Sequence, residues 1–287
     1  MTAVAMTSVA EPTLTRSSWR AVVALGWREG RRMVFSPVFG LVLALFLLMG
    51  GVESVAEAKL SLPSARTLYD VITFFTALYL GLLVYISAHL VTSSARRTGA
   101  DPQLAASALS ARQRRVGLCL GVLLGPGLLA LVLMTLAAVL GNSLITTGFD
   151  GFDEDRPLSL LLLFQLGLML VGGGLFAVMW ATWLRFPGSL PLGFVVLVFG
   201  TGVLLAPDRS PVNTWPWFAP YISAPQWFDD GWTQLGSHGW HAVYLVGLCA
   251  LAFCATMLRD REHRTKWLGI SAGIFLATVV AGALQVS

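Results

Sequence analysis

Long apolar runs, separated by short polar segments, dominate the pattern of hydrophobic and polar positions along the chain. A helix of about 20 apolar residues crosses a hydrocarbon core of roughly 30 Å, and seven runs come near this length. They cover residues 34–52, 69–92, 116–141, 158–181, 189–206, 241–258 and 267–285. The pattern therefore predicts an all-α membrane protein with six to seven transmembrane helices.

The charged residues sort by the side of the membrane that they would face. If the N-terminus lies in the cytoplasm and the spans alternate, fifteen of the nineteen Lys and Arg residues fall on the cytoplasmic side. Ten of the fifteen acidic residues then fall outside. Such an excess of positive charge inside indicates orientation. We expect a protein of the bacterial cytoplasmic (inner) membrane, with its N-terminus inside and its C-terminus outside.

The composition agrees with membrane insertion and removes several classes of function. Charged residues make up 12% of the chain and apolar residues 56%, a balance far from that of a soluble domain. The net charge of +4 is explained by the cytoplasmic arginines. A nucleic-acid partner would be indicated by a soluble basic module with stacking aromatic residues, and the sequence shows no such module. All three cysteines lie in apolar runs, which predicts neither a disulfide framework nor a metal site.

The chain before the first run has two parts. Residues 1–16 are mostly small and polar and are expected to be disordered. Residues 17–34 plot as an amphipathic helix, which is expected to lie in the headgroup plane because one side is basic and the other carries two tryptophans. The alternative is a basic flank that only orients the first span. The interfacial residues are Trp19, Arg20, Trp27, Arg31 and Arg32.

The polar segment 93–115 contains a helix start signal between two groups of arginines. Asp101 suits an N-cap and Pro102 suits the first helical position. A short apolar stripe follows, and Ser110 and Arg112 close it. The segment predicts a short helix projecting from the cytoplasmic face. A solvated loop would explain the arginines but not this helix, whose residues are Asp101, Pro102, Gln103, Leu104, Ala105, Ala108 and Leu109.

This layout resembles that of type-2 ABC transporter permeases. The run Arg96-Arg97-Thr98-Gly99, the stripe from Leu104 to Leu109, Ser110 and the basic residues 112–115 are similar to the loop that the family uses as a coupling helix, docked on a separate ATPase subunit. The Trp- and Pro-rich segment 207–240 resembles the short re-entrant helices that the family places between its fifth and sixth spans. The seventh run, 267–285, departs from the family's six-span plan.

The resemblance covers about residues 17–260, and we expect one transmembrane permease domain over residues 17–287. It also implies two copies of an ABC-type ATPase and either a homodimer or a second permease. A P-loop requires the pattern G-x-x-x-x-G-K-[ST]. Neither Lys59 nor Lys266 stands in such a pattern. The sequence therefore predicts no enzyme activity and no cofactor on this chain, with ATP and Mg bound by the partner ATPase.

Two patterns inside the runs concern packing and transport. Four polar residues of the second run fall on one helical face and would either line a translocation path or hydrogen-bond neighbouring helices; they are Tyr69, Thr73, Thr76 and Ser87. In the third run, glycines at 117, 121 and 125 precede Pro126-Gly127. This spacing predicts close helix packing, followed by a bend.

Three other classes of function compete with an exporter subunit. A secondary carrier generally buries acidic residues or histidines in its spans. Here the acids lie at span ends, and His89 lies near the cytoplasmic end of the second run, where we interpret it as partly hydrated. An intramembrane enzyme would need a catalytic set, and His238, His241, Asp229 and Asp230 lack the spacing of one. A scaffold is the third class. We favour an exporter subunit for a hydrophobic or amphipathic substrate: a lipid, drug or peptide.

Overall fold

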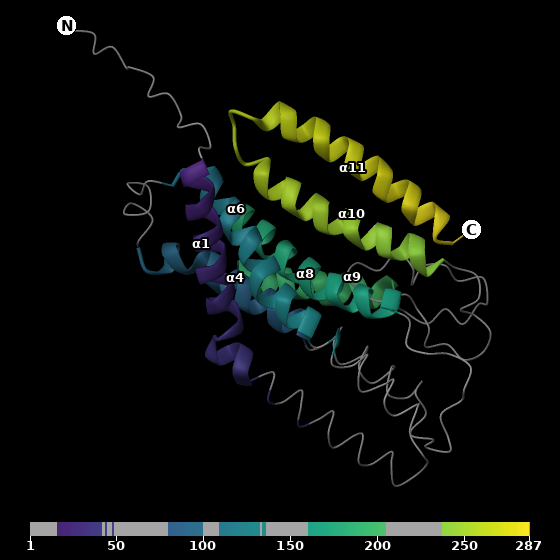
Figure 1. The fold of residues 1–287 in the computed structure, drawn as a ribbon, viewed down its shortest axis with the longest axis horizontal. Coiled ribbons are helices and arrows are strands. Elements are labelled where there is room, and N and C mark those ends of the chain that lie inside the picture. The colour runs from purple at the N-terminus through teal and green to yellow at the C-terminus, as the bar shows by residue number, and fades with distance from the viewer. Residues whose placement is uncertain are drawn as a thin grey trace, which may run out of the picture.

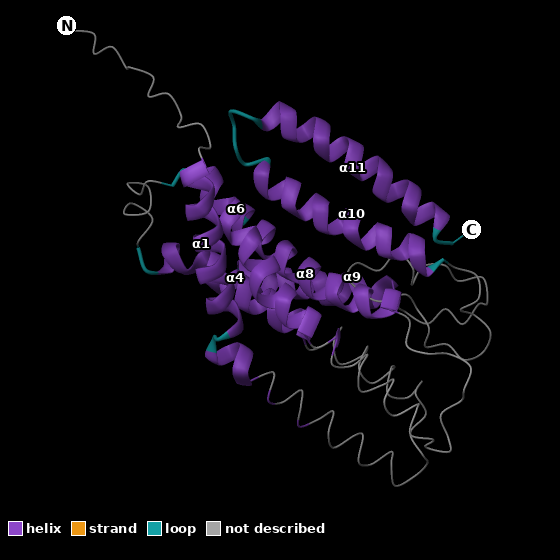
Figure 2. Cartoon of the chain, in the orientation of Figure 1, coloured by secondary structure: helices purple, strands orange, loops and turns teal. Residues whose placement is uncertain are grey.

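The computed structural model of the chain describes residues 16–41, 80–99, 109–132, 134–135, 160–204 and 237–286, together with positions 44 and 48. Every long regular element in these ranges is a helix (Figure 1, Figure 2). In chain order they are α1 (Arg16–Val34), α4 (Gly81–Arg97), α6 (Ala111–Val122) with the π-helical turn η2 (Leu123–Gly127), α8 (Leu160–Trp183), α9 (Ser189–Leu204), α10 (His238–Met257) and α11 (Arg264–Leu284).

Four helices in the described part of the chain are long and apolar enough to cross a membrane. They are Ala111–Val132, Phe164–Trp183, His238–Met257 and Arg264–Leu284, and they match the third, fourth, sixth and seventh predicted spans. The expectation of an all-α membrane-embedded protein therefore holds for the described residues. The apolar helix of the fifth run is shorter, at Ser189–Gly200.

Several predicted elements lie outside the described residues. These are the N-terminal residues 1–15, the second half of the first run apart from positions 44 and 48, the part of the second run before residue 80, and residues 205–236 of the outer segment with its re-entrant helices. The total of six to seven spans stays a prediction.

Helix α1 ends at a serine cap that starts the next helical turn. The amide of Phe35 still donates to Arg31 O at 2.8 Å. The amide of Phe39 then donates to Ser36 Oγ at 3.1 Å. Pro37 occupies the first helical position after this cap, where its missing N–H leaves no bond unmade. Ser36 and Pro37 therefore end α1 and begin a new helical segment.

Glycines on two helices bring α1 against α6. A Cβ placed on Gly26 would lie 3.1 Å from Gly117 O, and one placed on Gly121 would lie 3.1 Å from Gly26 O. Gly30 and Gly125 meet in the same way one turn further along. The predicted close packing of the third run is confirmed, and its partner is the Gly26-x-x-x-Gly30 pattern of α1. Backbones can approach this closely only where side chains are absent.

The main core is enclosed by α4, α6, α8 and α10, with α8 packed against both α4 and α10. Tyr85 of α4, Val122 of α6 and Val178 of α8 are fully buried in it. Pro126 is accommodated by η2, because a π-helical turn relieves the clash between the proline ring and the preceding turn. The helix then continues to Val132.

Helices α10 and α11 form an antiparallel hairpin on one side of this core (Figure 1). At its open end the amide of Ser237 donates to Gln285 O at 2.8 Å. Near its turn the rings of Phe253 and Trp267 meet edge to face, with centroids 5.9 Å apart. Large apolar side chains such as Phe275 and Leu276 project outward from α11, as expected of a helix that faces lipid.

Candidate functional site

The two tryptophans of α1 lie on a face that the rest of the described protein leaves open. Trp19 is 48% exposed and Trp27 is 50% exposed. Val22 and Met33, which the sequence pattern places on the same side, are buried, because that edge of α1 packs against α6. The apolar side of α1 that the sequence predicts is therefore divided into two faces. One meets the protein, and the other carries both tryptophans outward.

Arg20, Arg28, Arg31 and Arg32 of α1 are exposed, and they differ in their partners. Arg32 Nη1 donates to Glu29 Oε2 at 2.8 Å, and Glu29 is largely buried. Within the described ranges, the guanidinium groups of Arg28 and Arg31 have neither a hydrogen bond nor an ion pair. Two groups of N–H donors are thus unused by the described part of the protein.

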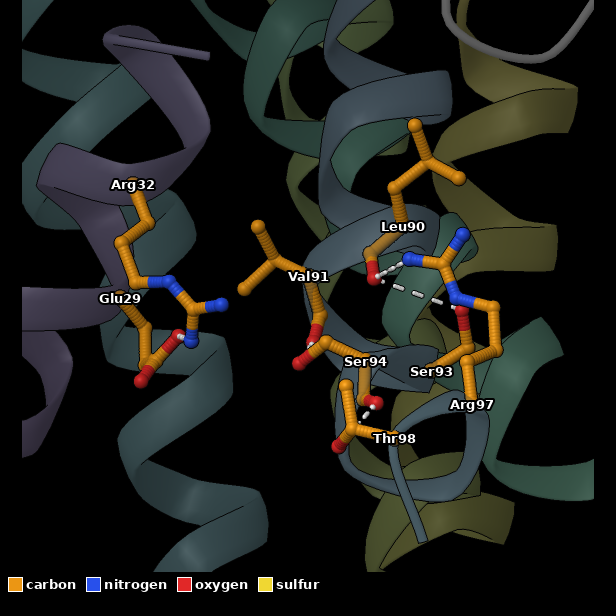
Figure 3. A network of polar contacts seen from close by, with 8 residues as sticks. All are labelled: Glu29, Arg32, Leu90, Val91, Ser93, Ser94, Arg97 and Thr98. Atoms are coloured by element: carbon orange, nitrogen blue, oxygen red, sulfur yellow. Dashed lines mark hydrogen bonds and ion pairs between the residues drawn. The ribbon is translucent and has the colours of Figure 1, made fainter. Parts of the chain in front are cut away.

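The last turns of α4 carry hydroxyl groups and arginines (Figure 3). Ser94 Oγ donates to Val91 O at 2.7 Å, and Thr98 Oγ1 donates to Ser94 O at 3.1 Å. Arg97 Nη2 donates to Leu90 O at 2.6 Å. Both hydroxyl groups therefore donate to carbonyl groups of their own helix, and their hydrogens are not available to another acceptor.

A groove of about 660 Å³ lies between α1 and α4. Arginines line it from both helices, since Arg28, Arg31 and Arg32 belong to α1 and Arg97 belongs to α4. Figure 3 shows Arg32 and Val91 facing each other across it. Its apolar wall is made of Trp27, Phe35, Leu90 and Val91. We call this cavity the arginine groove.

One residue of the predicted translocation stripe also lines the arginine groove. Ser87 is buried, and its hydroxyl donates to Val84 O at 3.3 Å. The other three residues of the stripe, Tyr69, Thr73 and Thr76, lie outside the described residues. The stripe as a whole therefore remains a prediction.

The predicted coupling segment is bounded by two clear helix signals. On one side α4 ends at Arg97, and Gly99 follows two residues later with a φ of 70°, the left-handed conformation that glycine adopts without strain. On the other side Ser110 caps α6: Gln113 N donates to Ser110 Oγ at 3.2 Å, and Ser110 N donates to Gln113 Oε1 at 2.8 Å. Ser110 thus starts the following helix, and Arg112 lies in the first turn of α6. The helices α4 and α6 cover both ends of the predicted loop 93–115.

Most of the coupling residues themselves fall between these signals. Leu109 is described and half-buried, directly before the Ser110 cap. The remainder lie outside the described residues: Asp101, Pro102, Gln103, Leu104, Ala105 and Ala108.

Other arginines at this end satisfy the last carbonyl groups of neighbouring helices. Arg96 Nη2 donates to Ala181 O of α8 at 2.9 Å, and Arg115 Nη1 lies 3.4 Å from Thr256 O of α10. Burial and the nearby positive charges lower the pKa of Arg259, in the turn after α10. The like-charged neighbours are Arg185, Arg115 and Arg96. Basic residues from four parts of the chain therefore converge here.

His89 is buried, which corrects the interpretation of a partly hydrated residue. Its exposure is 4%, and its Nε2 lies 3.2 Å from Ser189 Oγ, the first residue of α9. Trp180 Nε1 donates to Ser189 O at 2.7 Å, and Tyr85 donates to Leu190 O at 3.0 Å. This cluster ties the start of α9 to α4 and α8, and sequence spacing gave no signal for it.

The described histidines near the outer segment lie in contacts between helices. His241 is fully buried, and its Nδ1 lies 2.9 Å from Gln285 Oε1, so it joins α10 to the end of α11. Gln165 Nε2 donates to His238 O at 2.8 Å. In the parts of the chain that are described, no three His, Cys, Asp or Glu residues gather as metal ligands would. Asp229 and Asp230 lie outside these parts.

No protein-family model, curated protein or solved structure matches this chain.

Proposed function

We propose that the chain is the membrane-spanning permease subunit of an ATP-binding-cassette exporter in the bacterial cytoplasmic membrane. It works with two copies of a separate ATPase and as a homodimer or with a second permease. The observation that carries this proposal is the segment between α4 and α6. A glycine stop at Gly99 and the Ser110 capping box bound it, and its sequence between them has the N-cap signal of Asp101-Pro102 and an apolar stripe.

The packing around this segment supports a mechanical role. Helix α4 packs against α8, and α6 packs against α1 through backbone contacts at glycines. A displacement of the coupling segment by the ATPase would therefore move two tightly packed helix pairs. The chain contributes conformational change and no chemistry of its own, while ATP and Mg are bound by the ATPase.

The charge distribution of the spans supports an apolar or amphipathic substrate. Between residues 116 and 132, 164 and 183, 241 and 257, and 267 and 284, the sequence has no Asp, Glu, Lys or Arg. The buried histidines His89 and His241 each contact a polar side chain of another helix. Ion-coupled carriers usually place acidic groups inside their spans, and their absence from these four ranges favours ATP as the energy source. A lipid, drug or peptide with a large apolar part fits these walls.

The outward face of α1 supports an interfacial position for this helix. Trp19 and Trp27 together present large, exposed rings, and tryptophan favours the headgroup region because its ring is apolar and its N–H is polar. In this proposal α1 lies in the cytoplasmic headgroups and anchors α6 through the glycine contacts.

Purification with a coupled activity assay tests the proposal. The tagged chain, extracted from its native membrane, should carry an ABC-type ATPase, and the complex in proteoliposomes should export substrate only with ATP. Replacing the P-loop lysine of that ATPase by alanine should abolish ATP hydrolysis and export while leaving the complex assembled. Export that persists without ATP would make the chain a secondary carrier. A stable complex without any export would make it a scaffold.

A further inference from the structure

The arginine groove combines positive charge with apolar walls and carries no acidic side chain in its lining. We propose that it binds the phosphate group of an anionic phospholipid of the cytoplasmic leaflet, with an acyl chain lying against its apolar wall. This inference concerns a lipid ligand of the protein and does not depend on the transport function.

The guanidinium groups of the groove have donors available for an anion. The guanidinium groups of Arg28 and Arg31 bond to no other residue of the described ranges. Arg97 uses Nη2 for Leu90 O, which leaves most of the five N–H donors of its guanidinium group. Arginine holds phosphate through paired, charge-assisted hydrogen bonds. Elsewhere at this end Arg96 and Arg115 are directed to helix carbonyls instead.

Helix dipoles explain only part of this arrangement. The negative end of a helix dipole favours basic residues in the last turn, and Arg31, Arg32 and Arg97 occupy last turns. Arg28 lies before the last turn of α1, yet it also lines the groove. Glu29 compensates the charge of Arg32, and the three remaining like charges at one concavity repel one another. An anion bound between them would remove this repulsion.

The apolar wall distinguishes a lipid from a free phosphate ion. Phe35 is 78% exposed and Trp27 is 50% exposed, so both present apolar surface to whatever occupies the groove. Leu90 and Val91 extend this surface along α4. A phosphate ion gains nothing from such a wall, whereas an acyl chain buries apolar area against it. Basic pockets between helices at the cytoplasmic side of membranes recognise lipid headgroups by this combination.

Binding of soluble short-chain lipids to the purified full chain in neutral detergent tests the inference. The probe is dihexanoyl phosphatidylglycerol, measured by isothermal titration calorimetry. Dihexanoyl phosphatidylcholine has the same chains without net charge, and glycerol 3-phosphate has the phosphate without chains. We expect phosphatidylglycerol to bind at least tenfold more tightly than either.

Paired arginine variants locate the site. The double variant Arg28→Gln/Arg31→Gln should weaken phosphatidylglycerol binding at least tenfold. The matched double variant Arg261→Gln/Arg264→Gln removes the same charge from exposed positions outside the groove and should change it less than twofold. All four side chains are exposed, so unfolding temperatures should match that of the wild type.

Three results would overturn the inference. Equal binding of the two lipids would remove charge recognition, and equal losses in the two double variants would leave only general attraction to a basic protein. Glycerol 3-phosphate binding as tightly as phosphatidylglycerol would identify a site for free phosphate and not for lipid.

Discussion

Gly30 of α1 and Gly121 of α6 are in backbone contact: a Cβ built on Gly30 would stand 2.6 Å from the carbonyl oxygen of Gly121. No side chain fits between the two helices at this point. The contact fixes α1, which sequence patterning describes as a surface helix, to a span of the membrane domain. It therefore couples any movement of α6 to the helix that carries the exposed tryptophans.

Replacing Gly30 with alanine should destabilise the protein. Alanine is the better helix former by about 1 kcal/mol, but its methyl group would push α1 from α6, and overpacking of this kind costs about 1–3 kcal/mol or more. Gly273→Ala on α11 is the matched control, since a Cβ there meets no atom within 4 Å. In detergent, the thermal unfolding midpoint should be lower for Gly30→Ala than for the wild type, whereas Gly273→Ala should not lower it. Equal midpoints would mean that the helices separate freely.

The sequence could predict one half of this contact but not the other. The spacing of the glycines at 117, 121 and 125 in an apolar run predicts close packing. Gly26 and Gly30 have the same spacing, but they stand among arginines and tryptophans, whose amphipathic pattern dominates the interpretation of that helix. Which helices meet is a tertiary property, and one sequence contains no record of it.

Other features of the structure also differ in how far the sequence predicts them. Those set by neighbouring residues are predictable, and those that need a distant residue are not. Sequence patterning places Ser110 at the close of the apolar stripe, whereas it caps the start of α6. This role has a local signal, because Ser110-x-x-Gln113 is a capping-box pattern. The burial of His89 has no such signal, because its partner Ser189 comes from a helix about 100 residues later. The arginine groove likewise needs Arg97 of α4 beside the arginines of α1, although the basic residues of each helix are plain in the sequence.

The buried pair His241 and Gln285 should hold the end of α11 to the start of α10. Replacing Gln285 with leucine removes the acceptor 2.9 Å from His241 Nδ1, and the loss of a partner for a buried polar group costs about 1–3 kcal/mol. Hydrogen exchange at residues 280–286 should accelerate. Val280→Ala, at an exposed position of the same helix, should leave exchange at the pair unchanged. Protection in Gln285→Leu equal to that of the wild type would show that the backbone bond from Ser237 is sufficient.

The α10–α11 hairpin predicts a specific topology of the C-terminus. Because the helices are antiparallel, the turn 258–263 and Ser287 should lie on opposite sides of the membrane if both helices cross it. The basic turn should face the cytoplasm. In intact cells a membrane-impermeant maleimide should label Ser287→Cys but not Glu262→Cys, and permeabilised cells should label both. Labelling of neither in intact cells would place the C-terminus inside, as in a six-span plan.

The coupling segment is the part of the chain on which the proposed exporter function depends. If residues 101–109 form a helix docked on the ATPase, Leu104→Asp or Leu109→Asp would bury an unpaired carboxylate at the contact, which costs several kcal/mol. The complex should lose the ATPase, or keep it while ATP hydrolysis no longer responds to substrate. Ala111→Asp is the control: it makes the same kind of change at an exposed position in the first turn of α6, where a carboxylate favours the helix. Membrane insertion should be normal in all three variants, because the apolar spans are unaltered. Wild-type assembly and export in Leu104→Asp and Leu109→Asp would leave this segment without a coupling role and remove the main support for an ATP-driven exporter.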